Sequence, residues 1–317
     1  MQIDHAVEEF LAGYFSTSLR SAKTKVAYST DLAQFRAYCG VENAIELIKV
    51  ESLERWAAEL TERGYASVSV RRKFATIRVF FGYWVRRGAL PSSPLWRIRL
   101  DLGREHRLPR SLTAMDTKRL VEQAWSRIFP FQGEMSIPPD HRFLACRNLA
   151  IVEILFATGM RVGELIALNV SDWNEDETCF LVKGKGFRQR LAILPDKRSL
   201  IALRRYLTGR LQMQLGHNGL FVNSFGARLS AQGVARMLTK LAVDAKISVR
   251  VTPHVLRHTV ATLLLRLGAD IRVVQEVLGH TSIATTQRYT HVTVEHLRST
   301  LAAHHPNYHL GINIPEQ

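Results

Sequence analysis

Cysteine is scarce in this chain of 317 residues: there are three, Cys39, Cys146 and Cys179, far apart and in no metal-binding spacing. A disulfide framework is therefore not expected, and a reducing cytoplasm fits this cysteine usage. No run of eighteen apolar residues occurs, which predicts that the protein has no membrane span. The first residues carry acids where a secretory signal carries basic residues, so export is not predicted either.

Several motifs of phosphate and metal chemistry are also missing. The sequence has no P-loop, no His-Glu-x-x-His pattern and no cluster of Asp or Glu suited to two-metal phosphate chemistry. We therefore expect no nucleotide cofactor and no catalytic metal.

Acidic residues are few relative to basic ones. The 28 Asp and Glu stand against 43 Lys and Arg, which gives a formal net charge of +15. The excess is +6 over residues 1–110 and +9 over the remainder, so neither half is neutral. A charge of this sign attracts polyanions and lets their phosphates exchange counterions for side chains. Nucleic acid is thus the expected partner, with a basic protein that merely stays soluble as the alternative.

The first hundred residues are predicted to be helical. Apolar residues recur near a 3.6-residue period over 5–15, 24–39, 51–64 and 67–88. The last of these stretches has one apolar stripe, formed by Val70, Phe74, Ile77, Phe81 and Trp84. Its other face carries Arg71, Arg72, Lys73 and Arg78. We interpret these four as phosphate contacts that orient a duplex, and a solvated basic face is the alternative.

The stretch between Pro91 and Pro109 is basic and has few helix signals, which predicts an inter-domain linker. Four parts follow: a helical domain over 1–105, a linker over 106–111, a second domain over 112–303 and a tail over 304–317. The second domain is expected to contain a helix from Thr113, a loop over 126–141, a buried helix over 147–160 that ends at Gly159, and a hairpin over 178–194. Further helices are expected over 251–269, 270–280 and 282–292.

Two segments before residue 190 carry candidate chemistry, and each is weak alone. Arg161 follows Gly159, and Glu164 stands one helical turn later, a spacing that usually marks a surface ion pair of small value. Lys183 and Lys185 lie in the glycine-flanked turn of the hairpin, where lysines are most often only solubilising.

Two later segments are more suggestive. Thr252 and Pro253 predict a helix start, which places His254 and Arg257 at a helix N-terminus, where backbone N–H groups favour an anion. His258 follows and is equally typical of a packed core histidine. In the last segment Gly279 ends a helix, His280 lies on the turn, and Tyr289 follows in a new helix. A single tyrosine among polar residues usually packs its ring and hydrogen-bonds its hydroxyl.

Taken in order, these segments resemble the catalytic domain of the tyrosine recombinase (phage integrase) family, with the nearest likeness to Xer-type site-specific recombinases. The likeness rests on Arg-x-x-Glu after Ala-Thr-Gly, a lysine in a glycine-flanked turn, His-x-Leu-Arg-His, Leu-Gly-His and a closing Arg-Tyr-Thr-His. It covers 112–300 and, more weakly, 1–105. It implies a mainly α, α+β protein, with an N-terminal helical core-binding (SAM-like) domain and a mainly helical catalytic domain that holds a small β-hairpin or sheet.

The resemblance also implies roles for individual residues. Arg161 and Arg257 would hold the scissile phosphate, Lys185 would protonate the leaving 5′-hydroxyl, and Tyr289 would be the nucleophile. His254 and His280 match the two histidine positions, Glu164 and His258 match supporting positions, and Lys183 is a DNA-contacting residue and a weaker candidate for the lysine. Asn148 departs from the family, which commonly carries an acid after Arg147.

The implied function is that of a site-specific recombinase that cleaves and rejoins double-stranded DNA through a 3′-phosphotyrosyl bond, without ATP or metal. It implies a homotetramer on two paired sites, or assembly with a related recombinase, with 301–317 a candidate for docking on a neighbour. A type IB topoisomerase-like enzyme and a non-catalytic DNA-binding protein are the alternatives. The complete set of candidate catalytic residues argues against the second of these.

Overall fold

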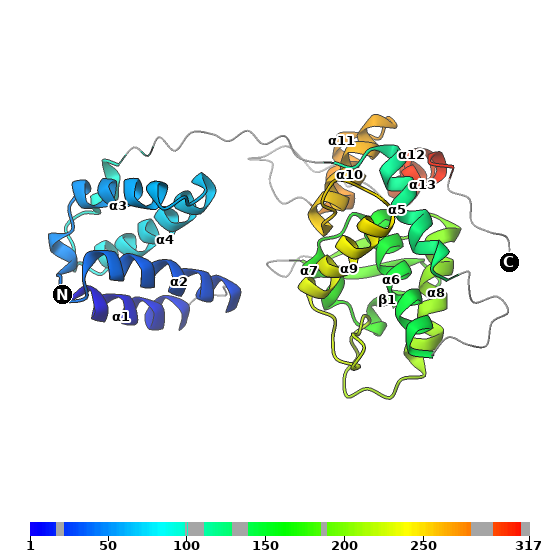
Figure 1. Ribbon diagram of the computed structural model, residues 1–317, viewed down its shortest axis with the longest axis horizontal. Coiled ribbons are helices and arrows are strands. Elements are labelled where there is room, and N and C mark those ends of the chain that lie inside the picture. Colours follow the sequence, from blue (N-terminus) through cyan, green and yellow to red (C-terminus); the bar gives the residue numbers. More distant parts are fainter. Residues whose placement is uncertain are drawn as a thin grey trace. The chain divides into compact units, whose positions relative to one another are not determined.

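The chain forms two compact units in the computed structural model, Met1–Arg107 and Leu108–Gln317 (Figure 1). The residues that the structure describes are 1–16, 22–98, 100, 111–128, 139–184, 189–279 and 294–311. Both units are mainly helical, and one small antiparallel sheet lies in the second unit, so the predicted fold class is confirmed. None of the helices in these ranges is long and apolar enough to cross a membrane.

The first unit packs helices around an aromatic core. Its elements are α1 (Ile3–Ser16), α2 (Ala22–Cys39), α3 (Val50–Glu62), α4 (Ser67–Arg86) and the short 3-10 helices η1 (Ile45–Leu47) and η2 (Pro94–Trp96). The five apolar residues of the predicted stripe on α4 are all buried, which confirms that face. They pack with Phe10 and Phe35, so α4 meets the other helices through large rings, whose burial contributes most per residue to a core.

The second unit is larger, and its elements place the candidate residues. The helices before the sheet are α5 (Ala114–Ser126), α6 (Pro139–Thr158), α7 (Val162–Ala167) and the 3-10 helix η4 (Val170–Asp172). The sheet consists of β1 (Trp173–Asn174), β2 (Cys179–Lys183) and β3 (Gln189–Ile193) in that order, all antiparallel. The helices after it are α8 (Lys197–Leu211), α9 (Ala231–Asp244), α10 (Pro253–Arg266), α11 (Ile271–Leu278), α12 (Val294–His304) and α13 (Pro306–His309).

Helix α6 is the centre of the second unit, because its residues 149–152 and 154–157 are all buried. Glu153 is the one charged residue within that run, and it is fully buried. Trp125 Nε1 donates to its Oε1 at 2.5 Å, and Arg198 Nε lies 2.8 Å from the same oxygen. Burial nevertheless raises the pKa of Glu153 to about 7. The helix thus carries an internal polar link to α5 and α8.

The segment after α12 lies on the second unit itself. His305 is fully buried, its Nε2 donates to the carbonyl of Ala157 at 2.9 Å, and its Nδ1 accepts from the backbone N–H of Asn307 at 3.2 Å. Asn307 also donates through its side chain to Asp196. Residues 305 and 307 thus tie the segment after α12 to its own unit, and the docking of 301–317 on a neighbouring subunit stays a prediction.

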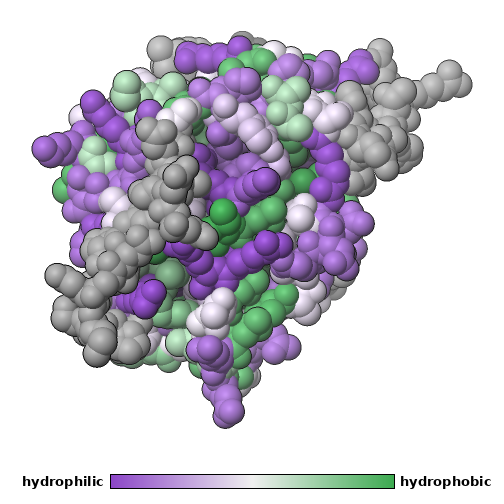
Figure 2. Space-filling model, turned by 90° about the vertical axis from the view of Figure 1, so that its right-hand side faces the viewer, coloured by the Kyte–Doolittle hydropathy of each residue, from purple (hydrophilic) through white to green (hydrophobic). Residues whose placement is uncertain are grey.

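One side of the molecule shows how hydrophilic and hydrophobic residues are distributed on its surface. Figure 2 shows one side of the molecule, on which hydrophilic side chains predominate and hydrophobic ones are visible in short strips between them.

Candidate active site

The turn between α6 and α7 holds the first candidate arginine. Gly159 ends α6 with φ +57°, in the left-handed region. A Cβ at this position would lie 2.5 Å from Leu278 Cδ2, so only glycine lets the turn pack against the end of α11. Arg161 is the N-cap residue of α7. The turn therefore brings Arg161 next to the C-terminal end of a helix more than a hundred residues later.

Arg161 is fixed from two sides. Its Nη1 donates to Glu164 Oε1 at 2.8 Å, and its backbone N–H donates to Glu164 Oε2 at 2.9 Å, so one carboxylate binds both the side chain and the backbone of Arg161. Its Nη2 donates to the carbonyl of Gly279 at 3.0 Å. The side chain is still 41% exposed, so one side of the guanidinium remains open to a ligand.

Arg257 meets the same two chain segments from helix α10. This helix begins as predicted, with the side chain of Thr252 accepting from the N–H of Val255 and Pro253 in the first turn. Arg257 Nη1 donates to the carbonyl of Gly159, and its Nη2 donates to the carbonyl of Leu278, both at 2.7 Å. The two arginines thus donate to the carbonyls of adjacent residues, 278 and 279.

The two guanidinium groups are held together at an electrostatic cost. Burial first, and then the positive charge of Arg161, lower the pKa of Arg257 to about 10. A bound anion would offset the repulsion between the two guanidinium groups, because it adds negative charge beside them. Clusters of groups with perturbed pKa values of this kind are typical of functional sites.

A third arginine, which the motifs did not indicate, completes the cluster. Arg190 on β3 donates through Nη2 to Glu164 Oε2 at 2.7 Å. Burial acts to raise the pKa of Glu164, but Arg190 and Arg161 together hold it below its usual value. The only sequence signal for Arg190 is a basic residue in a β-rich run, which says nothing of its partner.

Of the remaining candidate residues of the site, three lie within the described part of the chain and three lie outside it. His254 is exposed in the first turn of α10, and His258 is half-buried one turn later. Lys183 is exposed at the end of β2, with its Nζ 3.8 Å from Asp172 Oδ1. Lys185, His280 and Tyr289 lie outside the described residues, so their roles stay predictions.

The basic face of α4 divides in the structure. Arg71, Arg72 and Arg78 are exposed, as an outward basic face requires. Lys73 is 2% exposed, and its Nζ lies 3.2 Å from Oδ1 of the fully buried Asp31. The expected place of Lys73 on the surface is thus corrected: Asp31 draws its ammonium inside the unit. Arg72 contacts the same carboxylate at 2.5 Å but remains about half exposed.

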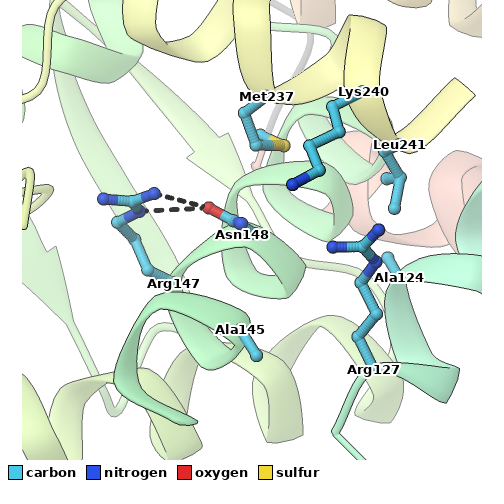
Figure 3. Close-up of a pocket in the computed structure, with 8 residues that line it drawn as sticks. All are labelled: Ala124, Arg127, Ala145, Arg147, Asn148, Met237, Lys240 and Leu241. Atoms are coloured by element: carbon cyan, nitrogen blue, oxygen red, sulfur yellow. Dashed lines mark hydrogen bonds between the residues drawn. The ribbon is translucent and has the colours of Figure 1, made fainter. Parts of the chain in front are cut away.

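Asn148 departs from the acid that is common in the family, but its side-chain oxygen still accepts hydrogen bonds from Arg147. Arg147 donates through Nε and Nη2 to Asn148 Oδ1, at 3.1 and 2.8 Å (Figure 3). Its Nη1 donates to the carbonyl of Val222 at 2.9 Å. The pair lines a pocket together with Ala124, Arg127, Ala145, Met237, Lys240 and Leu241. This pocket borders the middle of α6, about 15 Å along the helix from its end at Thr158, so it is separate from the arginine cluster.

Comparisons with known proteins identify the family of the chain that carries this arginine cluster. The profile described as the phage integrase family matches residues 134–296, and that of the phage integrase N-terminal SAM-like domain matches residues 7–88. The tyrosine recombinase XerC of Listeria innocua is 32% identical over 309 residues, which cover 94% of this chain and 97% of that protein. The chain belongs to the phage integrase family. It is a tyrosine recombinase, as the order of its motifs indicated.

Another curated relative is also a tyrosine recombinase. The tyrosine recombinase XerD of Halalkalibacterium halodurans is 36% identical over 292 residues, or 90% of this chain and 92% of that one. Among solved structures, a post-cleavage complex of the XerH site-specific recombinase with a palindromic difH substrate covers 94% of this chain and 79% of that chain, with a TM-score of 0.68 and 20% identity. A dimer of lambda integrase residues 75–356 bound to a COC′ core site has a TM-score of 0.67 at 18% identity, covering 89% and 93%. These structures share the fold.

Proposed function

We propose that this recombinase cleaves and rejoins double-stranded DNA through a 3′-phosphotyrosyl bond to Tyr289, with Arg161 and Arg257 on the scissile phosphate. The observation that carries this proposal is the convergence of the two guanidinium groups. They reach the carbonyls of residues 278 and 279, immediately before His280 and ten residues before the tyrosine. The Tn1549 transposon integrase, which shares the fold with a TM-score of 0.67 at 19% identity, is in complex with circular intermediate DNA, and this supports DNA as the substrate.

The arginines supply the largest part of the catalysis. Attack on a phosphodiester moves negative charge onto its two non-bridging oxygens, and guanidinium forks meet such oxygens bidentately. Removing one preorganised donor of this kind typically costs about 3 kcal/mol of transition-state stabilisation. Because protein groups already fix both arginines, little reorganisation is needed when DNA binds.

The proton transfers require the remaining residues. A tyrosine hydroxyl has a pKa of about 10 and needs a base at neutral pH. His254, at the exposed N-terminal end of α10, takes that proton, and Lys185 gives one to the departing 5′-oxygen. The bond from the Tyr289 oxygen to phosphorus forms while the bond from phosphorus to the 5′-oxygen breaks. A 5′-hydroxyl of another strand later reverses the step, so neither ATP nor metal is consumed.

Binding of the duplex draws on the basic residues outside the site. Arg71, Arg72 and Arg78 on α4 and Lys183 at the end of β2 are the proposed phosphate contacts, because their side chains are exposed. Lys73 is not among them. Exchange of strands between two sites needs two active subunits at each, so we propose a tetramer of this chain, or of it with a related recombinase, acting in the cytoplasm.

The test is recovery of a covalent adduct. Wild-type protein is incubated with duplexes that carry a randomised core, denatured, and freed of unbound DNA, and the attached strands are sequenced to map the cleavage position. The Tyr289→Phe variant should bind these duplexes within about twofold of wild-type affinity and retain no DNA after denaturation. A denaturation-resistant complex in that variant would show that another residue is the nucleophile.

Strand exchange separates this function from that of a topoisomerase. Two labelled duplexes with the mapped sequence are mixed with wild-type protein, and a supercoiled plasmid that contains one copy is assayed beside them. Recombinant duplexes support the proposal. Relaxed plasmid without recombinants would favour the nicking and closing activity.

A further inference from the structure

Arg190 occupies a position that no motif of the sequence singled out. It lies on β3 opposite Val182, five residues after Lys185 in the sequence. Its side chain is 12% exposed, and its Nη2 contacts the carboxylate of Glu164, which is itself 9% exposed. Glu164 in turn holds both the backbone and the side chain of Arg161. One buried carboxylate therefore joins Arg190 to the phosphate-binding arginine.

A second contact joins Arg190 to the other side of the site. Gly279 has φ +65° and ends α11. A Cβ at this position would lie 2.6 Å from Arg190 Nε and 2.8 Å from Arg190 Cδ, so the guanidinium packs directly against the glycine. The carbonyl of Gly279 accepts from Arg161. Arg190 thus supports the residue that precedes His280.

The charges of the cluster depend on Arg190 as well. Arg161, Arg190 and Arg257 with Glu164 carry a net charge of +2, and removal of Arg190 would leave +1. Glu164 would then direct its whole charge at Arg161, which weakens the attraction of Arg161 for a phosphate. The cluster would remain, but with a smaller field where the substrate binds.

We propose that Arg190 is a positioning residue of the strand-cleavage centre, which holds Glu164 against Arg161 and fixes the turn at Gly279 before His280. It rests on the proposed function, because it assigns a role within that reaction. Arg190 acts through its neighbours: its Nη1 is buried and makes no hydrogen bond within the described part of the chain, and its Nη2 is taken by Glu164. It links three segments that carry candidate catalytic residues, namely the hairpin, the turn before α7 and the end of α11.

The alternative is an ordinary structural ion pair, and the chain offers a matched control for it. Arg204 Nη2 lies 2.6 Å from Glu175 Oε1 in the same unit, but both side chains are at least half exposed. Arg204→Met removes an arginine–glutamate pair that does not contact Arg161 or Gly279. It should leave the rate of covalent adduct formation within about twofold of wild type.

The experiment measures adduct formation in a single turnover. The probe is a duplex with the mapped cleavage sequence and a nick beside it, so that the freed 5′-end diffuses away and the adduct accumulates. Arg190→Met should slow the reaction by roughly 10- to 100-fold at saturating protein, while the Kd for the same duplex changes by less than about threefold. Arg190→Lys should recover part of the rate, because lysine keeps the charge but not the planar fork.

A double-mutant cycle tests whether Arg190 acts through Glu164. In a Glu164→Gln background the Arg190→Met substitution should slow the reaction by less than about fivefold, because the carboxylate that it held is gone. An undiminished loss in that background would overturn the proposal. So would equal losses of binding and rate in Arg190→Met, or a wild-type rate in it.

Failure of this inference is distinguishable from failure of the proposed function. If wild-type protein forms no adduct with any duplex, the recombinase reaction itself is not observed. If wild-type protein reacts and Arg190→Met reacts equally fast, the role of Arg190 alone is refuted. Should Arg190→Met not fold, which thermal unfolding reveals, the comparison of Arg190→Lys with wild type in both Glu164 backgrounds decides.

Discussion

At the scale of single residues, Arg161 and Arg257, the two arginines proposed to bind phosphate, differ in how much the fold depends on them. Arg257 is buried and satisfies two backbone carbonyls that water does not reach. Arg161 is partly exposed, and its main partner, Glu164, keeps Arg190 when Arg161 is lost. The two arginines therefore share one proposed chemical role, but Arg257 has a large structural role and Arg161 a small one.

This difference predicts separate effects of two alanine substitutions. Arg257→Ala should abolish adduct formation and lower the free energy of unfolding by about 2–4 kcal/mol, because two buried acceptors lose their donor. Arg161→Ala should cost adduct formation as severely but stability by less than about 1 kcal/mol. Urea unfolding and the single-turnover assay measure both. Equal losses of stability in the two variants would contradict the assigned burial.

Gly159 gives a second test at this scale. Its positive φ and the 2.5 Å approach of a Cβ to Leu278 Cδ2 predict that Gly159→Ala destabilises the protein by about 2–3 kcal/mol. The control is Gly163→Ala within α7, where a Cβ meets nothing within 4 Å and alanine is the better helix former. Thermal unfolding of both variants should show a clear fall in Tm for the first and none for the second.

At the scale of elements, the sequence predicted the helix faces and helix ends that depend on residues near one another in the sequence. The period of α4, the start of α10 at Thr252 and the ends of α6 and α11 at Gly159 and Gly279 depend on neighbouring residues, and the structure agrees with each. What depends on distant partners was not predicted. Lys73 is buried because Asp31, 42 residues earlier, supplies its carboxylate, and Arg190 meets Glu164 only when β3 reaches α7.

The tail is another element that depends on distant partners. Its sequence shows no strong helical period, yet it forms α13, and His305 is buried against the carbonyl of Ala157 at the end of α6. The hydrogen bonds of His305 require a neutral ring, with the proton on Nε2 and a free pair on Nδ1. Burial lowers its pKa to about 4, against the opposing effect of the nearby Asp196. The anchor of the tail is therefore sensitive to acid.

This gives a prediction for stability against pH. Because the folded pKa of His305 is lower than the unfolded one, the unfolded chain binds the extra proton, and stability falls as the pH drops below about 6.5 toward 4. His305→Gln, which retains a donor for the carbonyl of Ala157, should reduce this fall. Urea unfolding from about pH 7 to about pH 5 measures the difference in the free energy of unfolding between wild type and His305→Gln. The opposite contribution of Glu153 is the same in both proteins, so it cancels in this difference. A constant difference across this range would refute the neutral buried ring.

At the scale of the whole molecule, the net charge of +15 is shared by both units, so binding of DNA should have a large electrostatic part. Affinity for a mapped duplex is expected to fall by roughly a thousandfold between about 50 and 200 mM salt, as for proteins with several phosphate contacts. Fluorescence anisotropy at a series of salt concentrations measures this slope. A flat response would show that the charge serves solubility alone.

The central claim is that the phosphate held by Arg161 and Arg257 becomes bonded to the oxygen of Tyr289. The most direct measurement is mass spectrometry of the proteolysed wild-type adduct, which identifies the residue that bears the DNA. The account predicts a nucleotide attached to Tyr289 through a 3′-phosphate, in one peptide only. Attachment to any other residue, or through a 5′-phosphate, would contradict it.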